Sequence, residues 1–332
     1  MQTVRFGNSG MRVSRFCLGA MTFGRDLDEQ QTARAVDEAI EHGINFIDTA
    51  DSYGRSEELL GQVLTPAKRE RVYLATKVWN RYCRGEAVGR NSRINITHSV
   101  ERSLGLLKTD YLDLLMLHHP DPETPLDETL ATLDNLVSQG KARYVGVANH
   151  YAWQMAYMLS QSRSRGLVPI ISQQACYNIL DRAIEPETVP FLERFNVALM
   201  CYGPLCRGIL TGKYHQPGYT TEPIHESTAN RIRNFIDDEA VVRIVAELRA
   251  IADGQGLRLN QLAVLWLKSK PYVSTIILGG SRPEHFRDVY TVADRDLPEA
   301  VVKQIDEVSE ERRYRRFFNQ PFATGFALDG RA

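Results

Sequence analysis

Residues 111–148 read YLDLLMLHHPDPETPLDETLATLDNLVSQGKARYVGVA, and this stretch decides the fold class. Its two ends, 111–117 and 142–148, are short apolar runs of the kind found in buried strands. The segment between them, 127–139, has the periodicity of an amphipathic helix. Strands that are buried on both faces and separated by a helix form parallel βαβ units. The stretch therefore predicts an α/β protein with a parallel sheet.

The same unit repeats along the chain. Further strands are expected at 15–18, 44–48, 72–76, 170–174, 197–202 and 274–278. Further helices are expected at 28–42 (with Asp28 as its N-cap), 56–64, 95–107, 152–161, 188–195, 238–253, 260–269, 283–293 and 299–317. Eight strand–helix repeats with no interrupting linker fit one closed (β/α)8 TIM barrel better than a doubly wound sheet with a second domain.

Three segments complete the predicted architecture. Residues 2–6 and 11–13, joined by a Gly-Asn-Ser-Gly turn, predict an N-terminal β-hairpin. Residues 207–236, rich in Gly, Thr and Pro, predict a long loop after strand 7, and such loops are often functional lids. We expect a single domain over 1–332, with the barrel core at 13–294 and a C-terminal helix and tail at 295–332.

Composition excludes several classes of protein. The 332 residues are 43% hydrophobic and 24% charged, and the net charge of −1 gives no general attraction to nucleic acid or acidic membranes. We expect no membrane span, because no apolar run reaches about 18 residues. A secretory signal is not expected, because the N-terminal residues lack an apolar core, and the Asn95-Ile96-Thr97 sequon then means little.

The cysteines indicate a reducing compartment. The chain has five of them, an odd number without a C-x-x-C pair: Cys17, Cys83, Cys176, Cys201 and Cys206. This pattern favours free thiols over disulfides or a zinc site, and predicts a cytoplasmic protein.

Four reactive side chains follow three consecutive strands. Asp48 ends the second apolar run and Tyr53 follows it by five residues, Lys77 ends the third run, and His118 ends the fourth. In a barrel of this kind the functional residues lie at the C-terminal ends of the strands. Each side chain alone has a structural explanation, but together they predict one site. Consecutive strand residues point to opposite faces, so His118 and His119 are not expected to share a metal.

These residues belong to blocks that resemble the aldo-keto reductase family. The blocks are INFIDTADSYGRSEELLG (44–61), LATKVW (74–79), SLGLLKTDYLDLLMLHHP (103–120), YVGVANH (144–150), PLCRGILTGKY (204–214) and ILGGSRPEH (277–285). They occur in the family's order from about residue 3 to residue 294. The resemblance implies an NADP(H)-dependent oxidoreductase that reduces aldehydes, ketones or keto-sugars.

The resemblance also implies a role for each of the four side chains. Tyr53 matches the general acid, Lys77 the residue that lowers its pKa, Asp48 the partner of that lysine, and His118 the residue that orients the carbonyl. The chemistry agrees, because hydride addition builds an alkoxide that must be protonated. A neighbouring ammonium makes a phenol a better acid near neutrality.

The chain has no dinucleotide fingerprint of the Rossmann type, since Gly254-Gln255-Gly256 follows a helix and reads as a helix end and turn. A barrel can instead hold a dinucleotide across its mouth. Positions that match cofactor contacts of the family are Gly19, Met21, Thr22, Asp48, Asn149, Gln174, Tyr202, Gly203, Pro204, Leu205, Arg207, Gly208, Leu210, Gly280, Ser281, Arg282, His285 and Asp288. Among these, Arg282 matches a 2′-phosphate contact, which favours NADP(H) over NAD(H).

Some positions depart from the family pattern. Ala148 replaces a serine, His285 stands where Gln or Arg is typical, and Asp288 with Val289 replaces the Glu-Asn pair that reads adenine. These changes bear on cofactor preference rather than on the four catalytic positions. His119 falls at a variable position and is given no role.

The substrate is expected against Phe23, Trp79 and His118. Charged side chains after the third strand are either solvated or contacts for an anionic substrate: Arg81, Arg84, Arg90 and Arg93. The basic run 312–316 reads either as a nucleic-acid patch or as part of a terminal amphipathic helix, and we expect the helix. The expected partner is a small molecule, with no nucleic acid, membrane or metal, and the sequence leaves monomer and homo-oligomer open.

Two other functions remain open at this stage. One is an NADP-binding regulatory subunit of the potassium-channel beta type, with little turnover. The other is a barrel isomerase or aldolase that uses Lys77 as a Schiff-base nucleophile.

Overall fold

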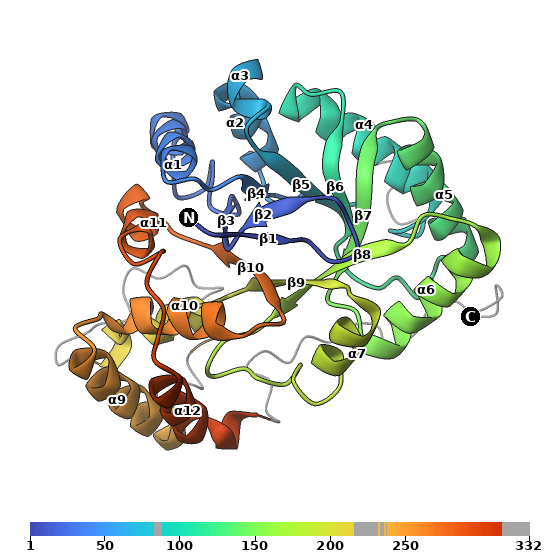
Figure 1. Cartoon of the computed structure of the whole chain (residues 1–332). Coiled ribbons are helices and arrows are strands. Elements are labelled where there is room, and N and C mark those ends of the chain that lie inside the picture. Colours follow the sequence, from blue (N-terminus) through green and yellow to red (C-terminus); the bar gives the residue numbers. More distant parts are fainter. Residues whose placement is uncertain (83–87, 216–231, 233–235, 237, 314–332) are drawn as a thin grey trace.

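The chain folds into a closed barrel of parallel strands with helices around it (Figure 1). The structure is a computed structural model that describes residues 1–82, 88–215, 232, 236 and 238–313. The barrel strands are β3 (Phe16–Gly19), β4 (Phe46–Asp48), β5 (Tyr73–Val78), β6 (Leu112–Leu117), β7 (Ala142–Ala148), β8 (Ile170–Cys176), β9 (Ala198–Tyr202) and β10 (Val273–Leu278). Each strand pairs with the next, and β10 pairs with both β9 and β3. The predicted (β/α)8 barrel is confirmed.

Helices alternate with these strands. They are α1 (Glu29–Glu41), α2 (Ser56–Val63), α3 (Pro66–Arg69), α4 (Arg93–Leu107), α5 (Leu126–Ser138), α6 (Ala152–Arg165), α7 (Thr188–Phe195), α9 (Glu239–Gly254), α10 (Leu259–Ser269), α11 (Pro283–Tyr290) and α12 (Glu299–Val308). Asp28 caps α1 as predicted. Its carboxylate accepts a hydrogen bond from the main-chain amide of Gln31, and the side-chain oxygen of Gln31 accepts one from the main-chain amide of Asp28. The last helix differs from its prediction, since it ends at Val308 instead of 317 and is followed by the 3-10 turn Glu310–Arg312.

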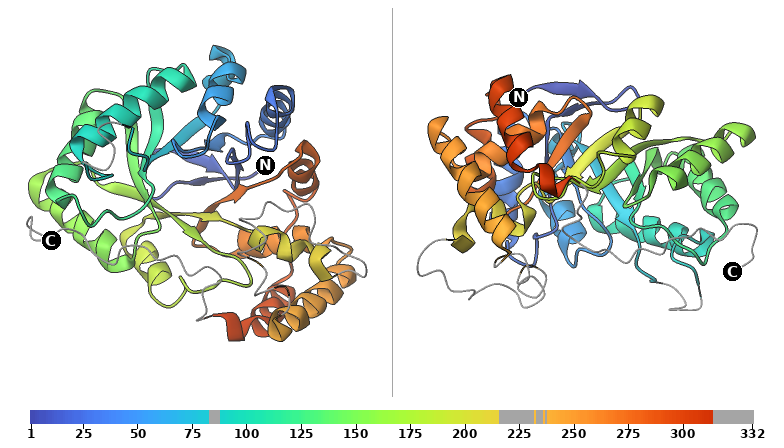
Figure 2. Two further views of the ribbon diagram at one scale, coloured as in Figure 1. Left: turned by 180° about the vertical axis from the view of Figure 1, so that it is seen from behind. Right: turned by 90° about the horizontal axis from the view of Figure 1, so that it is seen from below.

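An antiparallel hairpin precedes the barrel, as predicted. Its strands β1 (Thr3–Arg5) and β2 (Arg12–Ser14) lie across one end of the barrel (Figures 1 and 2). Phe6, Met11 and Val13 from the hairpin are buried with interior barrel residues such as Phe46 and Leu114. The hairpin therefore closes the end at which the strands begin.

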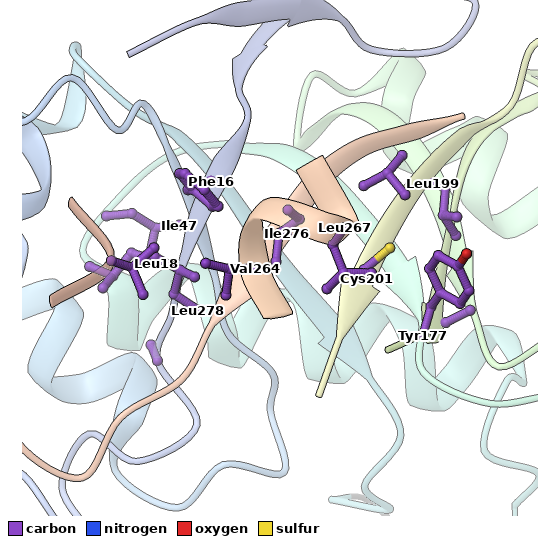
Figure 3. Close-up of a cluster of buried hydrophobic side chains, with 14 of the residues drawn as sticks. Phe16, Leu18, Ile47, Tyr177, Leu199, Cys201, Val264, Leu267, Ile276 and Leu278 are labelled. Carbon is purple, nitrogen blue, oxygen red and sulfur yellow. The ribbon is translucent and has the colours of Figure 1, made fainter. Parts of the chain in front are cut away.

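Two hydrophobic layers share the strands. Residues of one parity point into the barrel, and residues of the other parity pack against the helices, as Leu18, Ile276 and Leu278 do beside Val264 of α10 (Figure 3). Strand alternation places Asp48 on the same face as interior Phe46, and Lys77 on the same face as interior Ala75. The charged residues therefore lie inside the barrel near the ends of β4 and β5.

The predicted long loop is described only in part. Residues Cys206–Thr211 and Lys213–His215 form two 3-10 turns, while 216–231, 233–235 and 237 lie outside the described residues. The single-domain assignment over 1–332, with its core at 13–294, stays a prediction.

Candidate active site

Lys77 is the centre of a buried polar cluster at the C-terminal ends of β4 and β5. Its ammonium lies 2.7 Å from Oδ2 of Asp48 and donates to the main-chain oxygen of Thr49 at 2.8 Å and to the hydroxyl of Tyr53 at 3.4 Å. The Lys77 side chain is 0% exposed and that of Asp48 is 4% exposed. Gln174 of β8 donates to the other Asp48 oxygen at 2.8 Å. Both charges are therefore paired and hydrogen-bonded, as buried charges must be.

The charge state of this cluster follows from burial and pairing. Burial lowers the pKa of Lys77, but the charge of Asp48, together with Tyr53 and the hydrogen bonds to both, raises it above the ordinary value. Burial raises the pKa of Tyr53, and the neighbouring ammonium lowers it by a smaller amount, so the net direction is upward. Lys77 lowers the pKa of Tyr53 as expected, but burial raises it by more. At neutral pH the lysine is an ammonium and the tyrosine a neutral phenol.

His118 joins the cluster from the end of β6. Its ring packs edge-on against Tyr53, with ring centroids 5.7 Å apart. Its Nδ1 lies 3.4 Å from the hydroxyl of Ser52. Burial, with smaller contributions from the charges of Lys77 and His119, holds the pKa of His118 well below its ordinary value. The imidazole is therefore neutral and able to donate one N–H to a polar ligand. The structure brings together all four predicted side chains.

The prediction that His118 and His119 point to opposite faces is wrong. Their rings are stacked, with centroids 4.6 Å apart and planes 5° apart. The reason is that β6 ends at Leu117, so strand alternation no longer applies to the two histidines. Among the described residues, no group of three His, Cys, Asp or Glu side chains is arranged to hold a metal ion.

His119, which received no role from the sequence, belongs to the site. Its ring lies 4.6 Å from the indole of Trp79, and its Nδ1 lies 3.3 Å from Nδ2 of Asn149. The same Asn149 amide donates to the main-chain oxygen of His118 at 2.9 Å, and its Oδ1 accepts from the Tyr202 hydroxyl at 2.8 Å. Asn149 sits in the left-handed region with φ of 63°, a conformation that asparagine tolerates better than most residues. The only available signal was the position of His119 directly after a strand.

The residues expected at the substrate differ in exposure. Trp79 follows β5 and is partly exposed, and the guanidinium of Arg90 lies 4.5 Å above its ring. Phe23 is fully buried in the core cluster, so its substrate contact stays a prediction. Arg81 forms an ion pair with Glu123. Two of the four arginines considered as contacts for an anionic substrate, Arg81 and Arg90, therefore have partners within the protein. Arg84 lies outside the described residues.

The expected cofactor positions gather at the ends of β3, β9 and β10. Thr22 donates to the main-chain oxygen of Gly280 at 2.6 Å, which ties the loop after β3 to the loop after β10. Gly19 has no room for a side chain, because a Cβ there would lie 2.6 Å from the oxygen of Leu278. Met21 is 46% exposed beside these loops. Gly203, Arg207 and Gly208 all have positive φ, which turns the loop after β9 sharply.

Three basic side chains lie near the start of α11. Burial lowers the pKa of His285, and the charges of Arg282 and Lys213 lower it further. Arg282 is the N-cap residue of α11, and the amide of Ser281 lies 3.3 Å from Nδ1 of His285. The sequence reasoning missed Lys213, which lies in the block PLCRGILTGKY that carried the resemblance. A helix N-terminus with such side chains is suited to an anion.

Asp288 is bonded within the protein. Its carboxylate forms an ion pair with Arg258 and accepts hydrogen bonds from Asn260 and Gln261 of α10. Its predicted contact with the cofactor stays a prediction.

Other sequence predictions concern sites that carry no chemistry. Cys17, Cys176, Cys201 and Cys206 are free, as expected, and Cys83 lies outside the described residues. Asn95 of the sequon is buried, and its amide donates to the main-chain oxygens of Asn80 and Arg90. In the part of the chain that the structure describes, no helix is long and apolar enough to cross a membrane.

Comparison with known proteins identifies the family to which this barrel belongs. A model of the Aldo/keto reductase family matches residues 15–310. The chain belongs to this family. It is therefore an oxidoreductase of a family that acts on carbonyl groups of small molecules and generally uses nicotinamide cofactors.

Three relatives show the range of the family. A probable voltage-gated potassium channel subunit beta of Arabidopsis thaliana is 32% identical over 330 residues, which cover 94% of this chain and 98% of the relative. Aldo-keto reductase YhdN of Bacillus subtilis is 30% identical, with 93% and 94% covered. Versiconal hemiacetal acetate reductase of Aspergillus parasiticus is 31% identical, with 82% and 86% covered.

Proposed function

We propose that the chain is an NADP(H)-dependent reductase that converts aldehydes or ketones, keto-sugars included, to alcohols, with Tyr53 as general acid. The observation that carries the proposal is the contact between the Tyr53 hydroxyl and the Lys77 ammonium, 3.4 Å apart inside the mouth of the barrel. The phenol keeps its proton at neutral pH, because its ordinary pKa already lies well above 7 and burial raises it further. It is therefore in the state that a proton donor needs.

Each of the four side chains has a step in the reduction. Bound nicotinamide would supply the hydride, since no side chain can. Tyr53 then gives its proton to the alkoxide oxygen of the substrate, and Lys77 stabilises the phenolate that remains. Asp48 balances the ammonium at 2.7 Å. Neutral His118 donates to the carbonyl oxygen, and this bond strengthens as negative charge develops there.

The residues present fit a phosphorylated dinucleotide. Lys213 and Arg282 bring positive charge to the start of α11 beside a neutral His285, and the loops after β3 and β10 are joined through Thr22 and Gly280. Arg282 is exposed and would bind a 2′-phosphate through its planar guanidinium. Tyr202, Asn149 and Gln174 would hold the nicotinamide end, because all three lie in the hydrogen-bonded network that reaches Asp48 and His118.

The central test is Tyr53→Phe. We expect the rate of NADPH oxidation with a panel of aldehydes and ketones to fall by about 100-fold or more, because general acid catalysis is lost. NADPH affinity, measured by fluorescence titration, should stay unchanged. The matched control is Tyr73→Phe, because Tyr73 begins β5 and Lys77 lies near the other end of that strand. A wild-type rate in Tyr53→Phe would refute the role given to Tyr53.

Arg282→Ala tests the cofactor preference. The dissociation constant for NADPH should rise about tenfold, which is the loss of one charge-assisted contact, while that for NADH should not change. Arg287→Ala is the matched control, because this arginine of the same helix is paired with Glu38. An equal loss for both dinucleotides in Arg282→Ala would remove the argument for phosphate recognition.

A second candidate function is a regulatory subunit that binds NADP(H) and turns over slowly. The relative named as a potassium channel subunit beta, at 32% identity, is the observation that favours it. The complete set of Asp48, Tyr53, Lys77 and His118 favours the enzyme. Multiple turnovers of NADPH with one carbonyl of the panel would decide for the enzyme, and tight binding with a single turnover would decide for the regulator.

The Schiff-base alternative is the weakest. A nucleophilic lysine must be a neutral amine, whereas the pKa of Lys77 is raised by Asp48 and Tyr53. Borohydride should therefore trap no carbonyl adduct on Lys77. We also propose that the protein is cytoplasmic and that its partner is a small molecule. The location is in keeping with the four cysteines that the structure describes, all of which are free thiols.

A further inference from the structure

We propose that Asp51 is a positioning residue for the carbonyl pocket, because its carboxylate fixes the backbone of Trp79 and Asn80 at the end of β5. This inference rests on the proposed function, since Trp79 matters only if it borders the substrate. Asp51 does not reach the four catalytic side chains by a hydrogen bond of its side chain and is not proposed to move a proton in the reaction.

Asp51 binds the segment after β5 through four hydrogen bonds. Its Oδ2 accepts the amides of Trp79 at 3.0 Å and Asn80 at 3.1 Å. Its main-chain oxygen accepts from Nδ2 of Asn80 at 3.2 Å and from the hydroxyl of Tyr82. Asp51 itself is 2% exposed, and its own amide donates to the main-chain oxygen of Lys77. One buried residue of the loop after β4 thus determines where the chain goes after β5.

The segment that Asp51 fixes carries the aromatic wall of the site. The Trp79 indole contacts the guanidinium of Arg90, at 4.5 Å, and the ring of His119, at 4.6 Å. His119 is stacked on His118, which in turn contacts Tyr53. A shift of the Trp79 backbone would therefore change the wall that faces a bound carbonyl without removing any catalytic group. The expected consequence is a change in KM rather than in kcat.

The strength of this attachment depends on pH. Burial raises the pKa of Asp51 to about 7, and the charge of Glu57 raises it too, while the amides of Trp79 and Asn80 and the charge of Arg102 lower it. The other Asp51 oxygen, Oδ1, is buried without a hydrogen-bond partner. Glu57 faces it from α2 and Arg102 from α4, and the hydroxyls of Tyr53 and Tyr82 interact with it from the two loops.

Ionisation of Asp51 strengthens its hydrogen bonds from the Trp79 and Asn80 amides, because a carboxylate accepts more strongly than a neutral carboxyl group. The Trp79 segment is therefore held more firmly above pH 7 than below it. The KM for the carbonyl should be lower on the alkaline side of this transition, which distinguishes positioning from a purely structural role.

The first experiment uses the ligand-free full chain. Trp153→Phe removes an exposed indole, so that only Trp79 and the buried Trp266 remain to fluoresce. The pH dependence of the fluorescence then reports on Trp79. We expect a transition near pH 7 that disappears in Asp51→Asn. Glu57→Gln should move the midpoint to lower pH, because a like charge is lost, and Arg102→Gln should move it to higher pH. A transition that persists in Asp51→Asn would overturn the inference.

The second experiment measures steady-state kinetics with NADPH and the best carbonyl of the panel. Asp51→Ala should raise the carbonyl KM about tenfold, the equivalent of one charge-assisted hydrogen bond, with kcat little changed. Asp51→Asn keeps an oxygen acceptor and should restore most of the KM but remove its pH dependence. An unchanged KM in Asp51→Ala would contradict positioning. If wild type shows no turnover, the proposed function fails, while the fluorescence transition still tests the attachment of Trp79 to Asp51.

Discussion

Lys77 keeps a full positive charge inside the barrel because oxygen atoms of Asp48, Thr49 and Tyr53 surround its ammonium. Removing a charge from water costs several kcal/mol, and only a well-bonded partner compensates for this. Asp48 is such a partner, and its second oxygen is satisfied by Gln174. These bonds hold the ammonium next to the phenol, so the geometry that the proposed proton transfer needs is built into the protein itself.

Asp51 predicts how stability changes with pH. Its pKa is about 7 in the folded chain, against an ordinary value of about 3.9 when unfolded, so the folded state holds the proton more tightly. The associated stability is complete below about pH 4 and is lost as pH rises through 7. Asp51→Asn does not ionise, and its free energy of unfolding relative to wild type should therefore grow between pH 5 and pH 8, by up to about 3 kcal/mol.

Urea unfolding of both proteins at the two pH values checks this prediction. Asp110→Asn serves as the control, because Asp110 is an exposed aspartate in the loop before β6. A constant difference between wild type and Asp51→Asn across this range would show that the buried carboxyl group has an ordinary pKa.

The sequence alone was enough to predict that Asp48, Tyr53, Lys77 and His118 lie together, and the reason is geometric. Strand ends in a parallel barrel meet at one mouth, so a reactive residue directly after each apolar run must lie near the others. His119 and Asp51 could not be assigned in this way. Their contacts with Trp79 depend on where β5 and β6 end and on how two loops turn, and neither is encoded in periodicity.

At the scale of elements, α2 and α4 approach each other at Gly61. A Cβ at this position would lie 2.0 Å from the main-chain oxygen of Leu106 and 2.9 Å from Leu107. Gly61→Ala would push two helices apart, and backbone atoms cannot rotate away as a side chain can. We expect a loss of about 3 kcal/mol or more in the free energy of unfolding, measured by urea denaturation.

Gly105, in α4, is the matched control. It is also a helical glycine, but it is exposed and a Cβ there would meet nothing within 4 Å. Gly105→Ala should stabilise the protein by about 0.5 to 1 kcal/mol, because alanine loses less backbone entropy in a helix. Equal effects of the two substitutions would contradict the close packing of α2 and α4.

Element boundaries were predictable where a local signal fixed them. Asp28 and Gln31 form the capping box that starts α1, and both are visible in the sequence. The end of α12 depends on a distant residue instead. Arg182 donates to the hydroxyl of Ser309 and to the main-chain oxygen of Asp306, and Arg312 donates to the main-chain oxygen of Leu180. These contacts, 124 to 132 residues apart in the chain, draw the helix into a 3-10 turn, and no local pattern announces them.

At the scale of the whole molecule, the two ends of the barrel have different tasks. The four side chains proposed to be catalytic lie where the strands end. The hairpin β1–β2 closes the end where the strands begin (Figure 2). Gly7 at the hairpin turn fits against β8 and β9 so closely that a Cβ would lie 2.5 Å from the oxygen of Ile171. The sealed end is therefore packed like a core, which frees the other end to carry polar groups.

Phe6 tests this division. Its ring is fully buried and packs edge-on against Phe46 inside the barrel, with centroids 5.4 Å apart. Phe6→Ala should lower the free energy of unfolding by about 3 to 5 kcal/mol, because it leaves a cavity in the barrel interior. The KM and kcat for a carbonyl should not change, since the four side chains proposed to be catalytic lie at the other end of the barrel. Phe195→Ala, whose side chain is 51% exposed, should cost no more than about 0.5 kcal/mol. A Phe6→Ala protein with normal stability but altered KM would show that the hairpin acts on the site and does not merely close the barrel.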